Sequence, residues 1–149
     1  MGYPLPRKEG MTQPIQGYPK DTHIRYLFVD ERRSRRARLL NVTWEDLARC
    51  SKTLHDALSA AGITGDIRFI NLWDDRDVWQ NSLLLFAKHS HKQGWVIIGL
   101  GKKVQAQLTH AYIPHRAMIH PAASGALRER ARYHAHVRAV LHSNDEKAL

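Results

Sequence analysis

The side chains of Asp30, Asn71 and His120 are the strongest candidates for chemistry, because each stands at the end of a short apolar segment. The proline after His120 fixes an imidazole in a rigid loop directly after a strand, and Asp30 opens the polar segment after another. The carboxamide of Asn71 offers a donor and an acceptor together, which reading the edge of a pyrimidine demands. The structural alternatives are a turn-forming Asn71 and a rigid loop at His120-Pro121.

A concentrated basic run follows Asp30, because positions 32–38 contain five arginines. Guanidinium groups bind phosphate bidentately, so this run indicates contacts with a phosphate backbone. A solvated charged surface is the alternative, and it is the interpretation favoured for the arginines of segment 128–138. The residues expected to contact a nucleic acid are Arg32, Arg33, Arg35, Arg36, Lys102 and Ser124.

Other chemistry-bearing patterns are incomplete. The turn at Gly99-Leu100-Gly101 has Val104 where a dinucleotide fingerprint needs a third glycine, and its spacing does not form a P-loop. The ten histidines include no His-Glu-x-x-His pattern and no accompanying cysteine pair, so no metal site is predicted. No Gly-x-Ser-x-Gly segment indicates a serine hydrolase. We therefore expect no metal and no organic cofactor.

Length and composition limit the classes of protein that the chain can belong to. Its 149 residues suit one folded domain, and 23 Lys+Arg against 14 Asp+Glu give a formal net charge of +9. This charge favours a polyanionic partner, most simply a nucleic acid. The lone Cys50 cannot form an internal disulfide, and no apolar stretch approaches the roughly 20 residues that cross a bilayer. We expect a cytoplasmic protein with no membrane partner, associated with the nucleoid if it binds DNA; the sequence leaves the oligomeric state open and favours a monomer.

The chain divides into three regions of different composition. Residues 1–22 hold four of the six prolines and three of the nine glycines, which predicts a flexible basic arm. Residues 23–142 are expected to form a single α/β domain, and residues 143–149 a polar tail.

Alternating strand-like and helix-like segments predict an α/β fold of three layers (α/β/α) with a mostly parallel four-stranded sheet. Strands are expected at 24–29, 67–72, 95–100 and 116–119. Helices are expected at 43–61, 78–88, 102–109 and 126–141. Because ligands bind beyond the carboxyl ends of parallel strands, Asp30, Asn71 and His120 should meet at one edge of the sheet.

The order of these features resembles the uracil-DNA glycosylase superfamily over residues 24–141. Segment 69–72 (Phe-Ile-Asn-Leu) resembles the family's strand that ends in a base-reading Asn. Segment 95–105 is similar to its buried strand, glycine turn and helix, and segment 119–125 looks like its His-Pro-Ser loop. The family's first motif is divergent here, where Asp30 is followed by arginines.

The resemblance implies a DNA glycosylase of base excision repair, which extrudes uracil or a modified base and hydrolyses its N-glycosidic bond. Asn71 would read the base, His120 would donate to a base oxygen, and Asp30 would orient water or balance the sugar cation. Two alternatives remain open: a non-catalytic module of the same fold that binds DNA or a nucleotide, and a surface that binds an acidic protein. The basic run fits all three, whereas Asn71 and His120 favour the enzyme.

Overall fold

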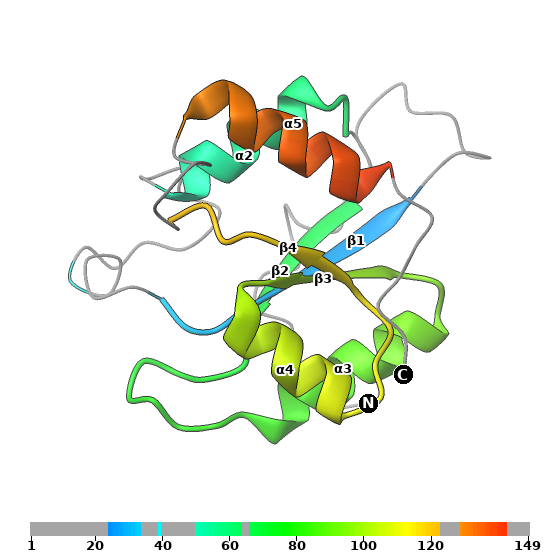
Figure 1. Cartoon of the computed structure of the whole chain (residues 1–149). Helices are drawn as coiled ribbons and strands as arrows, with labels where there is room; N and C mark the ends of the chain where they lie inside the picture. The colour runs from blue at the N-terminus through cyan, green and yellow to red at the C-terminus, as the bar shows by residue number, and fades with distance from the viewer. Residues whose placement is uncertain (1–23, 34–38, 40–49, 64–65, 123–128, 143–149) are drawn as a thin grey trace.

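The computed structural model describes residues 24–33, 39, 50–63, 66–122 and 129–142 of the chain (Figure 1). The predicted arm and tail lie outside the described residues, as do Arg35, Arg36 and Ser124. The four strands form one sheet in the order β2-β1-β3-β4, and every neighbouring pair is parallel. They are β1 (Arg25–Asp30), β2 (Asp66–Asn71), β3 (Val96–Leu100) and β4 (Arg116–Met118).

Four helices in the described part of the chain cover both faces of the sheet (Figure 1). The helices α2 and α5 lie on one face and pack against each other, and α3 and α4 lie on the opposite face. Their bounds are α2 (Cys50–Ala60), α3 (Asn81–Lys92), α4 (Lys102–His110) and α5 (Arg130–Leu141). The predicted three-layer α/β fold is therefore confirmed.

The strands separate two hydrophobic cores because successive side chains point to opposite faces of a sheet. On β1, Tyr26 and Phe28 join the core beneath α2 and α5, while Leu27 and Val29 join the core above α3 and α4. The ring of Phe28 stacks on that of Phe69 in β2, with 5.1 Å between the ring centroids. Both faces of β1 are buried, as expected for a central parallel strand.

Three arginines cap the carboxyl ends of helices, and each arginine belongs to a different element from the helix that it caps. The last carbonyl groups of a helix lack partners within the helix, and a guanidinium supplies donors and a favourable charge there. Arg25 donates to Gln93 O after α3, Arg138 to Ala60 O of α2, and Arg116 to Leu141 O of α5, each at 2.9 Å. Part of the positive charge of the chain therefore stabilises the fold.

One side chain bridges the ends of β3 and β4. The Gln105 amide donates from Nε2 to the carbonyl of Gly99 at 3.0 Å and to the carbonyl of Met118 at 3.1 Å. The Gly101 N–H donates to the same Met118 carbonyl at 3.0 Å. Helix α4 is thus attached to both strands at the edge where His120 follows.

The start of α3 differs from the sequence prediction. The pattern from Val78 predicts a helix, but α3 begins at Asn81. The Asp74 carboxylate accepts hydrogen bonds from the main-chain N–H groups of Arg76 and Val78 at 2.8 and 2.9 Å, which holds this segment in a turn. The adjacent Asp77 has a φ of 65°, and the helix therefore starts only after this turn.

The other element boundaries agree with the sequence within a few residues. The amino-terminal parts of the helices predicted at 43–61 and 126–141 fall largely outside the described residues. Within the described residues, no helix has the length and apolar character needed to cross a membrane.

Candidate functional site

The carboxyl ends of the strands bring Asp30, Asn71 and His120 to one edge of the sheet. Asp30 ends β1 and pairs in register with Asn71, which ends β2. Both side chains lie on the same face as Phe28 and Phe69, two residues earlier, because the side-chain period of a strand is two. His120 follows β4 by two residues, and its Nε2 lies 3.2 Å from Asp30 Oδ1. Two of the three predicted residues therefore touch, and the third ends the neighbouring strand.

The His120 ring is held in one orientation by its own loop. The main-chain N–H of Ala122 donates to Nδ1 at 3.0 Å. Because Nδ1 accepts this bond, the neutral ring carries its proton on Nε2, the atom beside Asp30. Gly101 lies against this residue and has a φ of 87°, a conformation that favours glycine. His120 is therefore a hydrogen-bond donor aimed at the edge of the sheet.

Buried acceptors at this edge lack donors. The Asp30 side chain is 5% exposed, and among the described residues its Oδ1 has no hydrogen-bond donor, since the His120 contact has ion-pair distance without hydrogen-bond geometry. Within the same part of the chain, the buried Oδ1 of Asn71 also accepts no hydrogen bond. An unsatisfied buried acceptor costs about 1–3 kcal/mol. A ligand that donates hydrogen bonds would remove this cost.

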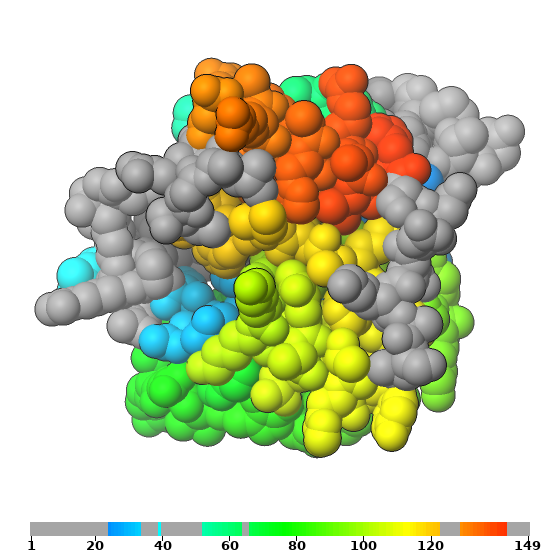
Figure 2. Space-filling model, viewed as in Figure 1, coloured from blue at the N-terminus to red at the C-terminus, as the bar shows by residue number. Residues whose placement is uncertain are grey.

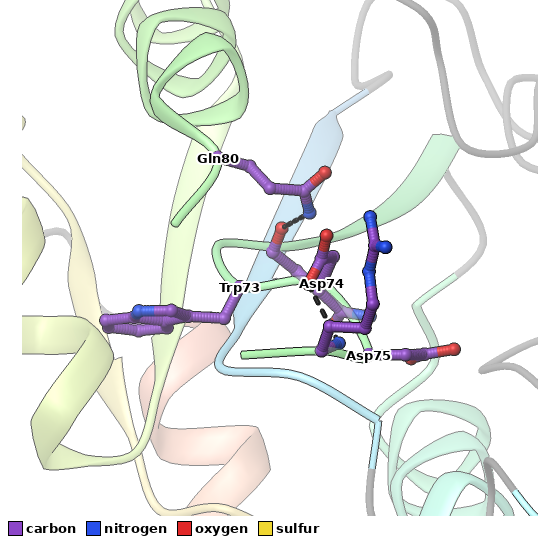
Figure 3. A pocket seen from close by; sticks show the side chains of 6 residues that line it. Trp73, Asp74, Asp75 and Gln80 are labelled. Atoms are coloured by element: carbon purple, nitrogen blue, oxygen red, sulfur yellow. Dashed lines mark hydrogen bonds between the residues drawn. The ribbon is translucent and has the colours of Figure 1, made fainter. Parts of the chain in front are cut away.

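A pocket of about 330 Å³ opens at the end of β2. Its lining residues are polar or amphipathic: Asn71, Trp73, Asp74, Asp75, Arg76 and Gln80. Figure 3 shows the Gln80 amide over the main chain of Asn71, to whose carbonyl it donates at 3.1 Å, and the Trp73 indole pointing away from Asp74 and Asp75. Asp30 and His120 do not line this pocket. Asn71 thus borders a hollow that lies at the end of β2 and does not include the Asp30–His120 contact.

The two described arginines of the basic run face carboxylates of the protein itself. Arg32 Nη1 lies 2.8 Å from Glu31 Oε2 and 3.3 Å from Asp77 Oδ1. Arg33 binds Asp75 through two hydrogen bonds, from Nε at 3.2 Å and from Nη2 at 2.5 Å. A phosphate would have to compete with these carboxylates. On the surface in Figure 2, the segment after β1 (blue) lies between the green segment after β2 and α4 (yellow-green).

The lysines at the start of α4 lie in two different environments. Lys102 lines a groove of about 460 Å³ along α4, together with Gln105, Ala106, Thr109, His110 and His115, and not with Asp30 or Asn71. Lys103 contacts Glu31 Oε2 at 3.1 Å, and its Nζ lies 4.4 Å from the ring centroid of Trp73. Lys103 was absent from the predicted site, although its place directly after the glycine turn was a visible signal.

Two residues of α5 support the loop that carries His120, and the sequence prediction did not include them. The Ile119 N–H donates to His136 Nε2 at 3.0 Å, and the Tyr133 hydroxyl donates to the Ile119 carbonyl at 2.9 Å. Burial lowers the pKa of His136 from its usual value of 6.5, because it disfavours the charged ring. Tyr133 and His136 are three positions apart, which puts both on one side of a helix. This spacing does not identify Ile119 as the residue that they contact.

Comparisons with known proteins found no matching family model and no similar curated protein. Within the described residues, no group of three or more His, Cys, Asp or Glu side chains is arranged to hold a metal ion. The function is therefore argued from the geometry of Asp30, Asn71 and His120.

Proposed function

We propose that the protein is a DNA glycosylase-like enzyme that accepts an extruded uracil or modified base and hydrolyses its N-glycosidic bond. One observation carries the proposal: a buried carboxylate, a carboxamide and a correctly protonated imidazole converge at the carboxyl edge of a parallel sheet, with 3.2 Å between Asp30 Oδ1 and His120 Nε2. Ligands of α/β folds bind at this edge. The resemblance of the sequence to the uracil-DNA glycosylase superfamily adds to this geometry.

Asn71 supplies the base recognition in this proposal. A uracil ring presents an N–H donor between two carbonyl acceptors, and a carboxamide presents the complementary acceptor and donor. The buried Oδ1 of Asn71, which accepts no hydrogen bond from the described residues, would receive the base N–H. Leaving such an acceptor unpaired is costly, so an analogue without that N–H would be rejected.

His120 and Asp30 supply the chemistry. When the bond between the sugar C1′ and the base nitrogen breaks, its electron pair leaves with the base, and the sugar becomes positively charged. The His120 Nε2–H stabilises the anionic base by donating to a base oxygen. Asp30 stabilises the sugar cation and accepts the proton of the water that adds to C1′. The base oxygen must therefore replace Asp30 Oδ1 as the partner of Nε2.

The proposal is tested with synthetic DNA duplexes that contain uracil or a set of modified bases. Treatment with alkali after incubation cleaves the strand wherever a base has been released. We expect cleavage with the parent protein, and its loss with Asn71→Ala and Asp30→Asn. His142→Gln is the matched control, because His142 is exposed after the end of α5. Absence of base release from every substrate would overturn the enzymatic proposal.

A non-catalytic module that binds DNA or a nucleotide is the second candidate. The pocket at the end of β2 favours it, because Asn71 lines this hollow whereas Asp30 and His120 do not. The two candidates differ in one measurement: the module would bind DNA with a steep salt dependence and would release no base.

A further inference from the structure

Three polar groups of the two peptide bonds that lead into His120 have hydrogen-bond partners: the Met118 carbonyl, the Ile119 N–H and the Ile119 carbonyl. The Met118 carbonyl accepts from Gly101 N–H and from the Gln105 amide, at 3.0 and 3.1 Å. The Ile119 N–H, which is in the same peptide group as the Met118 carbonyl, donates to His136 at 3.0 Å, and the Ile119 carbonyl, in the following peptide group, accepts from Tyr133 at 2.9 Å. The place of His120 is therefore fixed by side chains from α4 and α5.

The bond to His136 exists only while that ring is neutral. Its Nε2 accepts the Ile119 N–H, so the ring proton must be on Nδ1. A second proton would go to Nε2 and would place two N–H groups against each other. Burial lowers the pKa of His136 below 6.5, which keeps the ring neutral at neutral pH and leaves protonation to acidic conditions.

We propose that His136, together with Tyr133, is a proton-sensitive clamp that positions His120: when His136 accepts a proton, the clamp opens and His120 loses its alignment with Asp30. His136 acts through the Ile119 peptide and touches no substrate, so it is a positioning residue. The consequence for base release rests on the proposed function, whereas the clamp itself does not.

The charged groups on the elements packed against α5 have partners of their own. On α2, Asp56 contacts Lys52 at 3.3 Å and Arg130 at 4.0 Å. On β4, Arg116 donates to carbonyls at the end of α5. On α5 itself, Arg132 lies 3.7 Å from Glu129. Tyr133 contacts the His136 ring at 6.1 Å between centroids, His134 lies two positions before it on α5, and His120 follows Ile119, whose N–H His136 accepts. On α2, the His55 ring packs against Phe69.

The clamp is tested first without any ligand, by nuclear magnetic resonance on the full chain. We expect the Ile119 amide proton to shift as the pH falls from about 8 to about 5, with a midpoint below 6.5, as the hydrogen bond to His136 is lost. The shift should disappear in His136→Gln, whose side-chain oxygen accepts the same N–H without titrating. It should persist in His134→Gln, the matched control two positions along α5.

The second test measures base release, or DNA binding if no base is released, at the same pH values. The parent protein should lose about three- to tenfold between neutral and acidic pH relative to His136→Gln, as expected for one lost hydrogen bond. Tyr133→Phe should lower the rate or affinity at every pH without changing the pH profile.

The outcomes separate the two proposals. The clamp is overturned if the chemical shift of the Ile119 amide proton does not change with pH, or if it changes equally in His136→Gln. This conclusion does not depend on whether the protein acts on DNA. A titrating amide with no base release and no DNA binding supports the clamp and overturns the proposed function. A titrating amide with equal pH profiles for the parent and His136→Gln overturns the coupling to His120.

Discussion

At the amino edge of the sheet, Asp66 begins β2 with its side chain buried, and Arg68 and Arg25 both lie over the indole of Trp95, 5.1 to 5.3 Å from its ring. Burial lowers the pKa of Arg68 and the charge of Arg25 lowers it further, while Asp66 opposes both. At the carboxyl edge, Asp30 is equally buried, but the group that faces its Oδ1 is the imidazole of His120.

This comparison distinguishes a structural carboxylate from a candidate functional one. The charge of Asp66 acts on Arg68, whose pKa it raises against the effect of burial, and a guanidinium is always protonated. Asp30 faces the imidazole of His120 at 3.2 Å, and the acceptor of Asn71 next to it has no donor among the described residues. Polar groups held at such a cost are typical of binding and catalytic sites.

The largest expected effect concerns the imidazole at the carboxyl edge. We expect His120→Ala to reduce the rate of base release by about 10²-fold, because a donor to the departing base is lost. The measurement is single-turnover strand cleavage on uracil-containing DNA, with His142→Ala as the control. An unchanged rate would mean that His120 takes no part in base release. The carboxyl edge of the sheet would then have no more claim to a functional role than the amino edge.

The two buried aspartates should respond in opposite directions to the same substitution. Asp66→Asn should lower the free energy of unfolding by about 1–2 kcal/mol, because the partly buried Arg68 loses the opposite charge that acts on it. Asp30→Asn should leave it unchanged or raise it by up to about 1 kcal/mol, because a poorly compensated buried charge is removed. Urea unfolding at neutral pH measures both.

Asp56→Asn on the exposed side of α2 is the matched control for these aspartates and should stay within about 0.5 kcal/mol of the parent. Equal losses of stability at Asp30 and Asp66 would mean that Asp30 is structural as well.

A smaller effect is expected from the arginines that follow Asp30. Replacing Arg32 and Arg33 by Gln should reduce the slope of log affinity against log salt by less than about 1, because both already face carboxylates. Replacing Arg35 and Arg36 should reduce it by up to about 2 if they contact phosphates as the sequence predicts. Fluorescence anisotropy with labelled DNA measures the slopes, and a flat slope for the parent protein would contradict phosphate binding altogether.

The smallest effect is the pH dependence of stability. Because burial lowers the pKa of His136 in the folded chain, its neutral form is favoured by folding. This contribution is complete above the unfolded value of 6.5 and is lost as the pH falls toward the lower folded value. Thermal unfolding should therefore show a larger loss in acid for the parent than for His136→Gln. Identical losses would indicate that other histidines dominate.

The sequence was sufficient to predict the strands of the sheet, because each strand is a short apolar run that is followed by turn residues. It also placed Asp30, Asn71 and His120 at one edge, because the carboxyl ends of parallel strands necessarily share an edge. It misplaced the start of α3, since the hydrogen bonds that Asp74 accepts compete with the helix, and residue patterns do not reveal which wins.

Long-range partners were beyond the reach of sequence patterns. Arg33 is hydrogen-bonded to Asp75, 42 positions away. The basic run therefore has a carboxylate partner that the composition of the run itself does not show. His136 meets Ile119 only because α5 docks beside β4, so its spacing from Tyr133 and His134 could not indicate a peptide partner. Such contacts depend on packing between elements and not on local pattern.

The amide of Gln105 has a practical meaning for anyone who wishes to redesign the protein. Two hydrogen atoms on one nitrogen connect the carbonyls of Gly99 and Met118, so this side chain reinforces the pairing of β3 and β4 at the end where His120 follows. Gln105→Glu would put a carboxylate against both carbonyls and push the strand ends apart.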